Sequence, residues 1–147
     1  MADHRKLAQE ASESLGQKDF GRFAALHDES GEFKGPDGKT VDHKQHVANT
    51  RGLFDALSDA KITVLTVVSE GDTYAIEQVV EGTHTGTLRM PGGQEIPPTG
   101  KRVRIDSIVF GETNSEGKIK RSHVKADRMQ LMEQIGMMPQ PAGAATS

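Results

Sequence analysis

Two residues suited to acid/base chemistry lie near the end of the chain, His123 and Asp127. The alternating segment 118–125 predicts the last strand, and on an extended chain an even separation places both side chains on one face. Four residues span about 13 Å, so a substrate between them could lose a proton to one group and gain one from the other. Lys125 shares this face by parity, and would either polarise a carbonyl or turn out to water.

Each member of this pair also has a purely structural interpretation. Asp127 directly precedes a predicted closing helix at 129–135, and aspartate is a preferred N-cap residue. Enclosed in an apolar pocket, the same carboxylate would become a better base, because burial disfavours its charged form. If this face of the strand points outward, Asp127 and His123 are both solvated.

Further polar candidates come from two other strands and from one helix. His84 lies in the motif Gly-Thr-His-Thr-Gly at 82–86, and would either donate to a developing oxyanion or bond to a neighbouring strand. Asp106 interrupts an apolar strand and is either a solvent-facing residue or a second pocket acid. His43 and His46 share a helical face, but a spacing of three without a nearby carboxylate is no zinc signature, so we predict no metal site.

The residues expected to line a pocket are mostly apolar. Tyr74 is the only tyrosine and would present its hydroxyl to the interior or pack against it. Phe54 and Met129 are candidate substrate contacts on the third and last helices, and the methionines near 129–138 would form an adaptable entry, a dimer face or part of the core.

The elements that position these residues follow from periodicity and turn residues. Helical spacing predicts helices over 2–15, from Asp19 to about 26, and over 42–57, with a short strand possible at 30–33. From residue 60 the period becomes two, which predicts strands over 61–69, 73–85 and 101–111 before the last one. Turns fall at 35–39, 70–72 and 113–117, and a Pro/Gly-rich loop at 90–100. Helices followed by long antiparallel strands predict an α+β fold, a cone-shaped barrel whose strongly curved, mainly antiparallel sheet packs on the N-terminal helices.

Composition narrows the possible functions. The chain has 147 residues, a net charge of −3 with both signs interspersed, and no cysteine. These values favour one domain over 1–138 with a flexible tail at 139–147, and argue against nucleic-acid or membrane partners and against thiol chemistry. With no long apolar run and a polar N-terminus, we expect a cytoplasmic protein.

The element order and its motifs resemble the SnoaL-like polyketide cyclases, members of the nuclear transport factor two-like superfamily, over nearly the whole chain. The segments that carry this resemblance are residues 82–86, the Ile-Pro-Pro-Thr-Gly-Lys-Arg-Val stretch at 96–103, Gly-Lys-Ile at 117–119, and the acid-then-helix ending at 127–136. The resemblance implies an intramolecular aldol cyclisation without cofactor or metal, with Asp127 at the position of the family's acid. Val109 stands where the founding cyclases carry a histidine, and His123 where a tryptophan is frequent.

The sequence therefore predicts a cofactor-free cyclase, of lyase or isomerase type, that closes a ring in a polyketide-like secondary-metabolite intermediate. Asp127, His123 and His84 are its catalytic candidates, and a pocket lined by Tyr74, Asp106, Val109, Met129 and Phe54 is expected to bind the substrate. The alternatives are an epoxide hydrolase or ether-ring cyclase of the same fold, or a non-catalytic cone that binds a small hydrophobic molecule. By analogy with relatives we expect a homodimer formed through the outer face of the sheet, and it stays open whether the loop at 90–98 acts as a lid.

Overall fold

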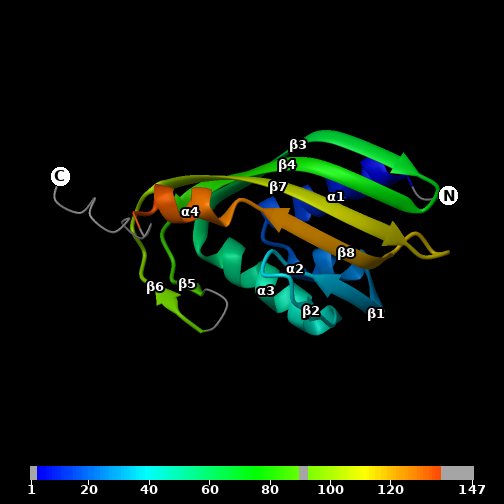
Figure 1. Ribbon diagram of the computed structural model, residues 1–147, viewed down its shortest axis with the longest axis horizontal. Coiled ribbons are helices and arrows are strands. Elements are labelled where there is room, and N and C mark those ends of the chain that lie inside the picture. The colour runs from blue at the N-terminus through cyan, green and yellow to red at the C-terminus, as the bar shows by residue number, and fades with distance from the viewer. Residues whose placement is uncertain (1–2, 90–92, 137–147) are drawn as a thin grey trace.

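The computed structural model describes residues 3–89 and 93–136 and has the predicted α+β architecture. The elements in chain order are α1 (His4–Gly16), α2 (Phe20–Ala25), β1 (His27–Lys34), β2 (Thr40–Val41), α3 (His43–Asp55), β3 (Leu57–Glu70), β4 (Thr73–His84), β5 (Leu88–Arg89), β6 (Glu95–Ile96), β7 (Arg102–Thr113), β8 (Ile119–Ala126) and α4 (Arg128–Gln134). Six strands form one sheet in the order β2-β1-β8-β7-β4-β3, in which only the β1–β8 pair is parallel (Figure 1).

Each of the four helices begins at an aspartate. The carboxylates of Asp3, Asp19, Asp42 and Asp127 accept the backbone N–H three residues further on, at 2.9–3.1 Å. This contact satisfies one of the amides that a helix leaves free at its start. The caps explain why the helices start where they do, whereas α3 ends at Asp55, two residues before the predicted end, because Leu57 already pairs with β4.

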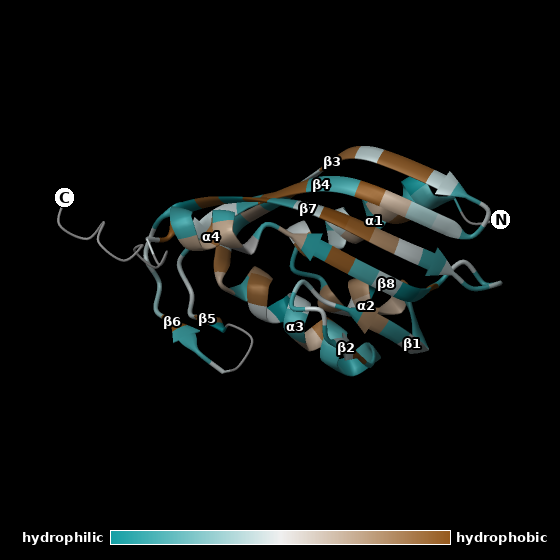
Figure 2. Cartoon of the chain, viewed as in Figure 1, coloured by the Kyte–Doolittle hydropathy of each residue, from teal (hydrophilic) through white to brown (hydrophobic). Residues whose placement is uncertain are grey.

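The sheet curves around the helices, and its two faces differ in burial. On β7, Val103, Ile105 and Ser107 are buried, while the alternate residues Arg104 and Asp106 are exposed. The same alternation of apolar and polar residues is visible along the strands in Figure 2. We call the side covered by the helices the inner face and the opposite side the outer face.

Two apolar clusters fill the space inside the cone. The larger one gathers around Phe54, Leu57 and Ile105 and includes Leu131 of α4 and Ile135, which directly follows that helix. The smaller one lies around Phe33 and Tyr74 at the other end of the sheet. Bulges in β3 between residues 58 and 61 and between 64 and 66 interrupt its pairing with β4, and bulges of this kind increase the local bend of a strand.

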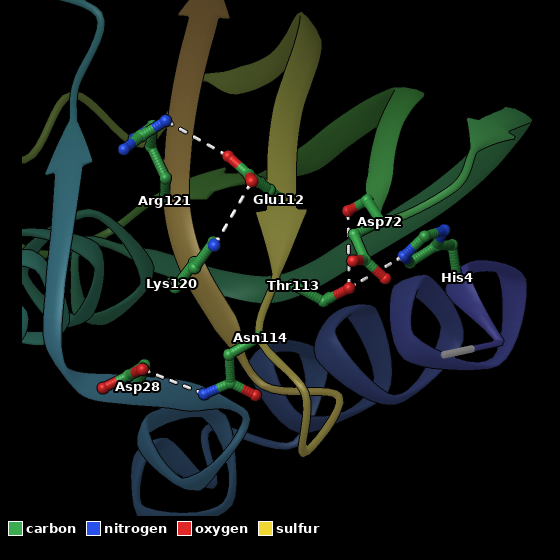
Figure 3. Close-up of polar contacts among 8 residues, drawn as sticks. All are labelled: His4, Asp28, Asp72, Glu112, Thr113, Asn114, Lys120 and Arg121. Carbon is green, nitrogen blue, oxygen red and sulfur yellow. Dashed lines mark hydrogen bonds and ion pairs between the residues drawn. The ribbon is translucent and has the colours of Figure 1, made fainter. Parts of the chain in front are cut away.

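Polar contacts join the elements at the end of the sheet nearest the β7–β8 turn (Figure 3). His4 of α1 lies 3.2 Å from the Thr113 hydroxyl, which in turn donates to the Asp72 carbonyl at 3.3 Å. Asn114 donates to the Asp28 carboxylate at 2.9 Å, which ties the turn to β1. The same figure shows Glu112 paired with Lys120 and Arg121 across the β7–β8 pair.

The loop predicted at 90–100 is partly ordered into a small hairpin that the sequence did not reveal. Leu88 of β5 and Ile96 of β6 lie opposite each other, and both side chains are buried in the larger cluster. Strands of two residues are too short to show a period, so only burial distinguishes them from a loop. Residues 90–92, the predicted tail and the methionines at 137 and 138 lie outside the described residues.

No helix among residues 3–89 and 93–136 is both long enough and apolar enough to cross a bilayer.

Candidate functional site

The pair singled out at the end of the chain lies on the outer face. Asp127 is exposed, and its Oδ1 accepts the Gln130 N–H at 2.9 Å as the cap of α4. His123 lies opposite Phe110 of β7 and is half-buried. Partial burial, followed by the positive charges of Lys34 and Lys125, lowers the pKa of His123.

Asp106 and Asp127 line the same open groove on the outer face, with a volume of about 280 Å³. Its other side chains include Leu65, Ile108 and Lys125. Asp106 is already engaged there, since Gln130 Nε2 donates to its Oδ2 at 3.2 Å. With Glu77, the groove thus brings three carboxylates and an amine together, but on the outer face of the sheet.

His84 lies at the end of β4 on the inner face and is 1% exposed. Its Nδ1 is 2.9 Å from the Thr99 hydroxyl oxygen and accepts the Thr99 backbone N–H at 3.4 Å. Its Nε2 is buried and has no hydrogen-bond partner in the described part of the chain. An unsatisfied buried polar atom costs about 1–3 kcal/mol, which makes Nε2 a candidate contact for a substrate oxygen.

The glycines around His84 explain how the motif fixes it in place. A Cβ on Gly82 would lie 2.9 Å from the Leu57 Cβ, and one on Gly86 would lie 2.8 Å from the Asp55 carbonyl oxygen. Both are distances that real Cβ atoms do not reach, so only glycine lets β4 run this close to the end of α3 and the start of β3. His84 N also donates to the Lys101 carbonyl at 2.8 Å, which holds the strand end against the 97–101 segment.

The structure does not bring the three catalytic candidates together. Asp127 N donates to the Asp106 carbonyl and His84 N to that of Lys101, so the two contacts are five residues apart along the extended segment 101–106, roughly 17 Å. The two side chains also lie on opposite faces of the sheet. His84 and Asp127 therefore cannot contact one small substrate in this conformation.

The candidate substrate contacts separate in the same way. Tyr74 and Phe54 are buried on the inner side, and Val109 packs against the smaller cluster. Tyr74 lies over Gly111, where its hydroxyl would overlap an added Cβ, and burial raises its pKa. Met129 is 58% exposed on α4.

A histidine cluster that the sequence only hinted at lies near α2 and α3. His46 stacks on Phe33 with ring centroids 4.7 Å apart, and its ring is 5.1 Å from that of His27. The Phe23 carbonyl accepts the His27 Nδ1–H at 2.8 Å, and that of Ala24 accepts the His43 Nε2–H at 2.9 Å. Burial lowers the pKa of His27 to about 4 and that of His46 to about 3.

Within residues 3–89 and 93–136, no group of three or more histidine, aspartate or glutamate side chains is arranged to hold an ion. The sequence showed the shared helical face of His43 and His46, but His27 comes from a strand that was predicted to begin only at residue 30. Two more residues were missed. Thr99 was seen only as part of a motif, and Ser122 has a buried hydroxyl without a partner in the described chain.

Helices packed inside a strongly curved, mainly antiparallel sheet define an α+β cone of the nuclear transport factor two and ketosteroid isomerase type. The family model of the SnoaL-like polyketide cyclases matches residues 5–135. The chain belongs to this family. No curated protein matches the chain.

Solved structures agree on the fold at low sequence identity. AclR from Streptomyces galilaeus, described as a candidate hydroxylase, is 21% identical with a TM-score of 0.78, over 92% of this chain and 96% of that one. IdmH from Streptomyces antibioticus, described as a candidate polyketide cyclase, is 19% identical with a TM-score of 0.76, over 91% and 99%. A protein from Catenulispora acidiphila with a ketosteroid isomerase-like fold is 14% identical with a TM-score of 0.71, over 96% and 100%.

Proposed function

We propose that this protein is a cofactor-independent cyclase that closes a ring in a linear, polyketide-like small molecule. Family membership supports the reaction class. The observation that carries the proposal is the His84 Nε2 atom, a polar atom enclosed on the inner face without a partner in the described chain. It lies where two of the motifs that resemble the family, 82–86 and 96–103, are joined by the contact between His84 and Thr99.

The chemistry requires a donor of this kind. A carbon next to a carbonyl group loses a proton to a base, and the resulting enolate carbon attacks a carbonyl carbon further along the chain. One C–C bond forms, the attacked oxygen becomes an alkoxide that takes up a proton, and water leaves in a later step. Negative charge moves from one oxygen to another, and a fixed N–H donor in a dry site typically accelerates such a step by about 10²–10³.

The β5–β6 hairpin lies close in the chain to the segment that contacts His84. Leu88 and Ile96 are both buried in the cluster that fills this end of the cone, and the segment after β6 leads to Thr99. Because Nε2 is buried, a substrate reaches it only when a neighbouring segment moves outward, and this hairpin is the element that leads directly into Thr99, the residue in contact with His84. We therefore propose that the hairpin acts as the lid of the site.

The proposal is tested with a minimal triketone, heptane-2,4,6-trione, which gives 5-methylresorcinol and water on ring closure. Product is followed by mass spectrometry and NMR. His84→Phe removes both ring nitrogens and is expected to lower turnover at least about 100-fold, whereas His84→Gln keeps a donor and loses less. A His84→Phe variant that folds, as judged by circular dichroism, and turns over like the wild type would refute the role of His84.

On the strength of the family position alone we also propose Asp127 as an acid/base residue. Because Asp127 and His84 lie on opposite faces of the sheet, this role is an alternative to that of His84 in this conformation, and it has its own test. The substitution Asp127→Asn keeps a capping oxygen but removes the group that accepts the proton, so it separates the two roles. A loss of about a hundredfold or more with the fold intact would assign acid/base chemistry to Asp127. Turnover within a few-fold of the wild type would leave it the helix cap that its contact with Gln130 describes.

A second candidate function is a non-catalytic cone that binds a small hydrophobic molecule. It is favoured by the exposure of Asp127 and by its engagement as a helix cap. Under this alternative the wild type does not convert the triketone, nor open an epoxide or close an ether ring, yet apolar ketones raise its melting temperature. Substrate turnover by the wild type that depends on His84 would exclude it.

We also propose that two copies pair through the outer face. Four large apolar side chains are 43–57% exposed there: Leu65, Val68, Ile108 and Phe110. Acidic Glu77 on β4 and basic Lys125 on β8 lie on either side of Ile108, so a twofold axis along β7 would place opposite charges together. Ile108→Lys is expected to convert a dimer into a monomer in analytical ultracentrifugation, and a wild type that sediments as a monomer at all concentrations would refute the pairing.

A further inference from the structure

The two contacts on His84 Nδ1 determine where the ring carries its proton. The Thr99 backbone N–H can only donate, and it reaches Nδ1 at 3.4 Å. Nδ1 therefore presents its lone pair, and in the neutral ring the proton lies on Nε2. The contacts of the Thr99 hydroxyl are consistent with this tautomer. Its oxygen accepts the Lys101 N–H at 3.3 Å, so its own hydrogen is free to point at Nδ1, which lies 2.9 Å from that oxygen.

The backbone on both sides of Thr99 holds it against the histidine. Gly100 N donates to the His84 carbonyl and His84 N to that of Lys101, both at 2.8 Å. Gly100 has a φ of +69°, a conformation that favours glycine. Pro98 restricts the backbone of Pro97, the residue that precedes it. The Pro-Pro-Thr-Gly sequence thus presents both the amide and the hydroxyl of one threonine to the same nitrogen.

We propose that Thr99 is the positioning residue of the site, and that it fixes His84 as a hydrogen-bond donor through Nε2–H. This inference rests on the proposed function, in which the partner of Nε2–H is a carbonyl or enolate oxygen of a polyketone. It also assigns a role to the imidazole. Because the lone pair of Nδ1 already accepts the contacts from Thr99, His84 stabilises the oxyanion and does not remove the proton. The proton goes to another acceptor.

This arrangement differs from that of an ordinary buried histidine. His27 and His43 each donate to a backbone carbonyl of the same protein, which is what a structural role requires. In His84 the contacts converge on one nitrogen, while the other has no partner in the described chain. The asymmetry points to a ligand group outside the protein.

The first test reads the tautomer directly and needs no substrate. Histidine side chains are labelled with ¹⁵N, and the two ring nitrogens are distinguished by two-bond ¹H–¹⁵N correlation NMR, with His84 assigned from its loss in His84→Gln. The wild type and Thr99→Ser are expected to show a bare Nδ1 and a protonated Nε2. Thr99→Val is expected to show a mixture of both tautomers, since only the longer amide contact remains. Thr85→Val, the same change at an exposed threonine next to His84, is the matched control and should behave like the wild type.

The second test is turnover of heptane-2,4,6-trione. Thr99→Val is expected to lower kcat about 10- to 100-fold with little change in KM, and Thr99→Ser is expected to restore most of it. A merely structural threonine would lower the melting temperature without this split between kcat and KM.

The outcomes separate the two proposals. A wild-type His84 protonated on Nδ1 overturns the role of Thr99 whatever the activity. A folded Thr99→Val variant whose ring signals match those of the wild type overturns the role of the Thr99 hydroxyl, because valine keeps the backbone N–H. If Thr99→Val does not fold, the wild-type and Thr99→Ser spectra still decide. A wild type with the expected tautomer but no conversion of polyketones supports the geometry and refutes the proposed function.

Discussion

Acid is expected to destabilise this protein through two buried histidines, His27 and His46. Both have a pKa well below the ordinary value of 6.5, about 4 for His27 and about 3 for His46, and burial is the main cause. Between pH 6.5 and these values the unfolded chain binds a proton at each histidine that the folded chain does not. Stability is therefore fully present above pH 6.5 and is lost as the pH falls toward 4.

The magnitude follows from the two pKa values. At about pH 4.5, roughly two pH units below the ordinary histidine pKa, each residue reduces the free energy of unfolding by about 2–3 kcal/mol. The two together reach about 5 kcal/mol, which is comparable to the total stability of a small domain. Their rings are 5.1 Å apart, so the second protonation is further disfavoured by the first charge.

The assay is urea denaturation at about pH 7 and pH 4.5, with the free energy of unfolding compared between the two. His46→Leu keeps an apolar contact with Phe33 and cannot be protonated, so its loss on acidification should be smaller than that of the wild type by about 2–3 kcal/mol. Asn49→Leu, a change at an exposed residue of α3 that does not titrate, is the control and should lose as much as the wild type. An equal loss in His46→Leu and the wild type would refute the assignment of the acid response to this cluster.

Substitutions at three further positions test packing, helix capping and strand-edge pairing elsewhere in the fold. Gly111→Ala should destabilise the fold by about 1–3 kcal/mol in urea denaturation, because an added Cβ would overlap the Tyr74 hydroxyl; a neutral result would mean that Tyr74 moves aside freely. Asp127→Ala should cost about 1 kcal/mol through loss of the α4 cap, while Asp127→Asn should cost much less, and equal losses would argue against capping. Gln134→Ala should increase hydrogen exchange at the Arg104 amide, which donates to the Gln134 side chain on the free edge of β7; unchanged protection there would show that this edge needs no partner.

Much of the fold was predictable because its signals are local. The caps at Asp19 and Asp127, and the hairpin turn at Gly71 with a φ of +60°, depend on residues only a few positions apart. Alternation along 101–111 likewise identified the strand and separated its two faces, and the exposed position of Asp106 follows from that alternation. The helix end at Asp55 was misjudged because the competing partner of Leu57 is His84, which lies far away in the sequence.

Local patterns in the chain were enough to specify the helices, the long strands, the α+β class and the set of residues capable of chemistry. Which of those residues share a space depends on contacts between distant segments. Parity placed His123 and Asp127 on one face, but nothing local indicates whether that face meets helices or water, and the curvature of the sheet turns it outward. His84 is enclosed on the other face, where Thr99, fifteen residues further along the chain, contacts its Nδ1. The sequence did not predict this contact, because a hydrogen bond between distant segments produces no periodic pattern of residues.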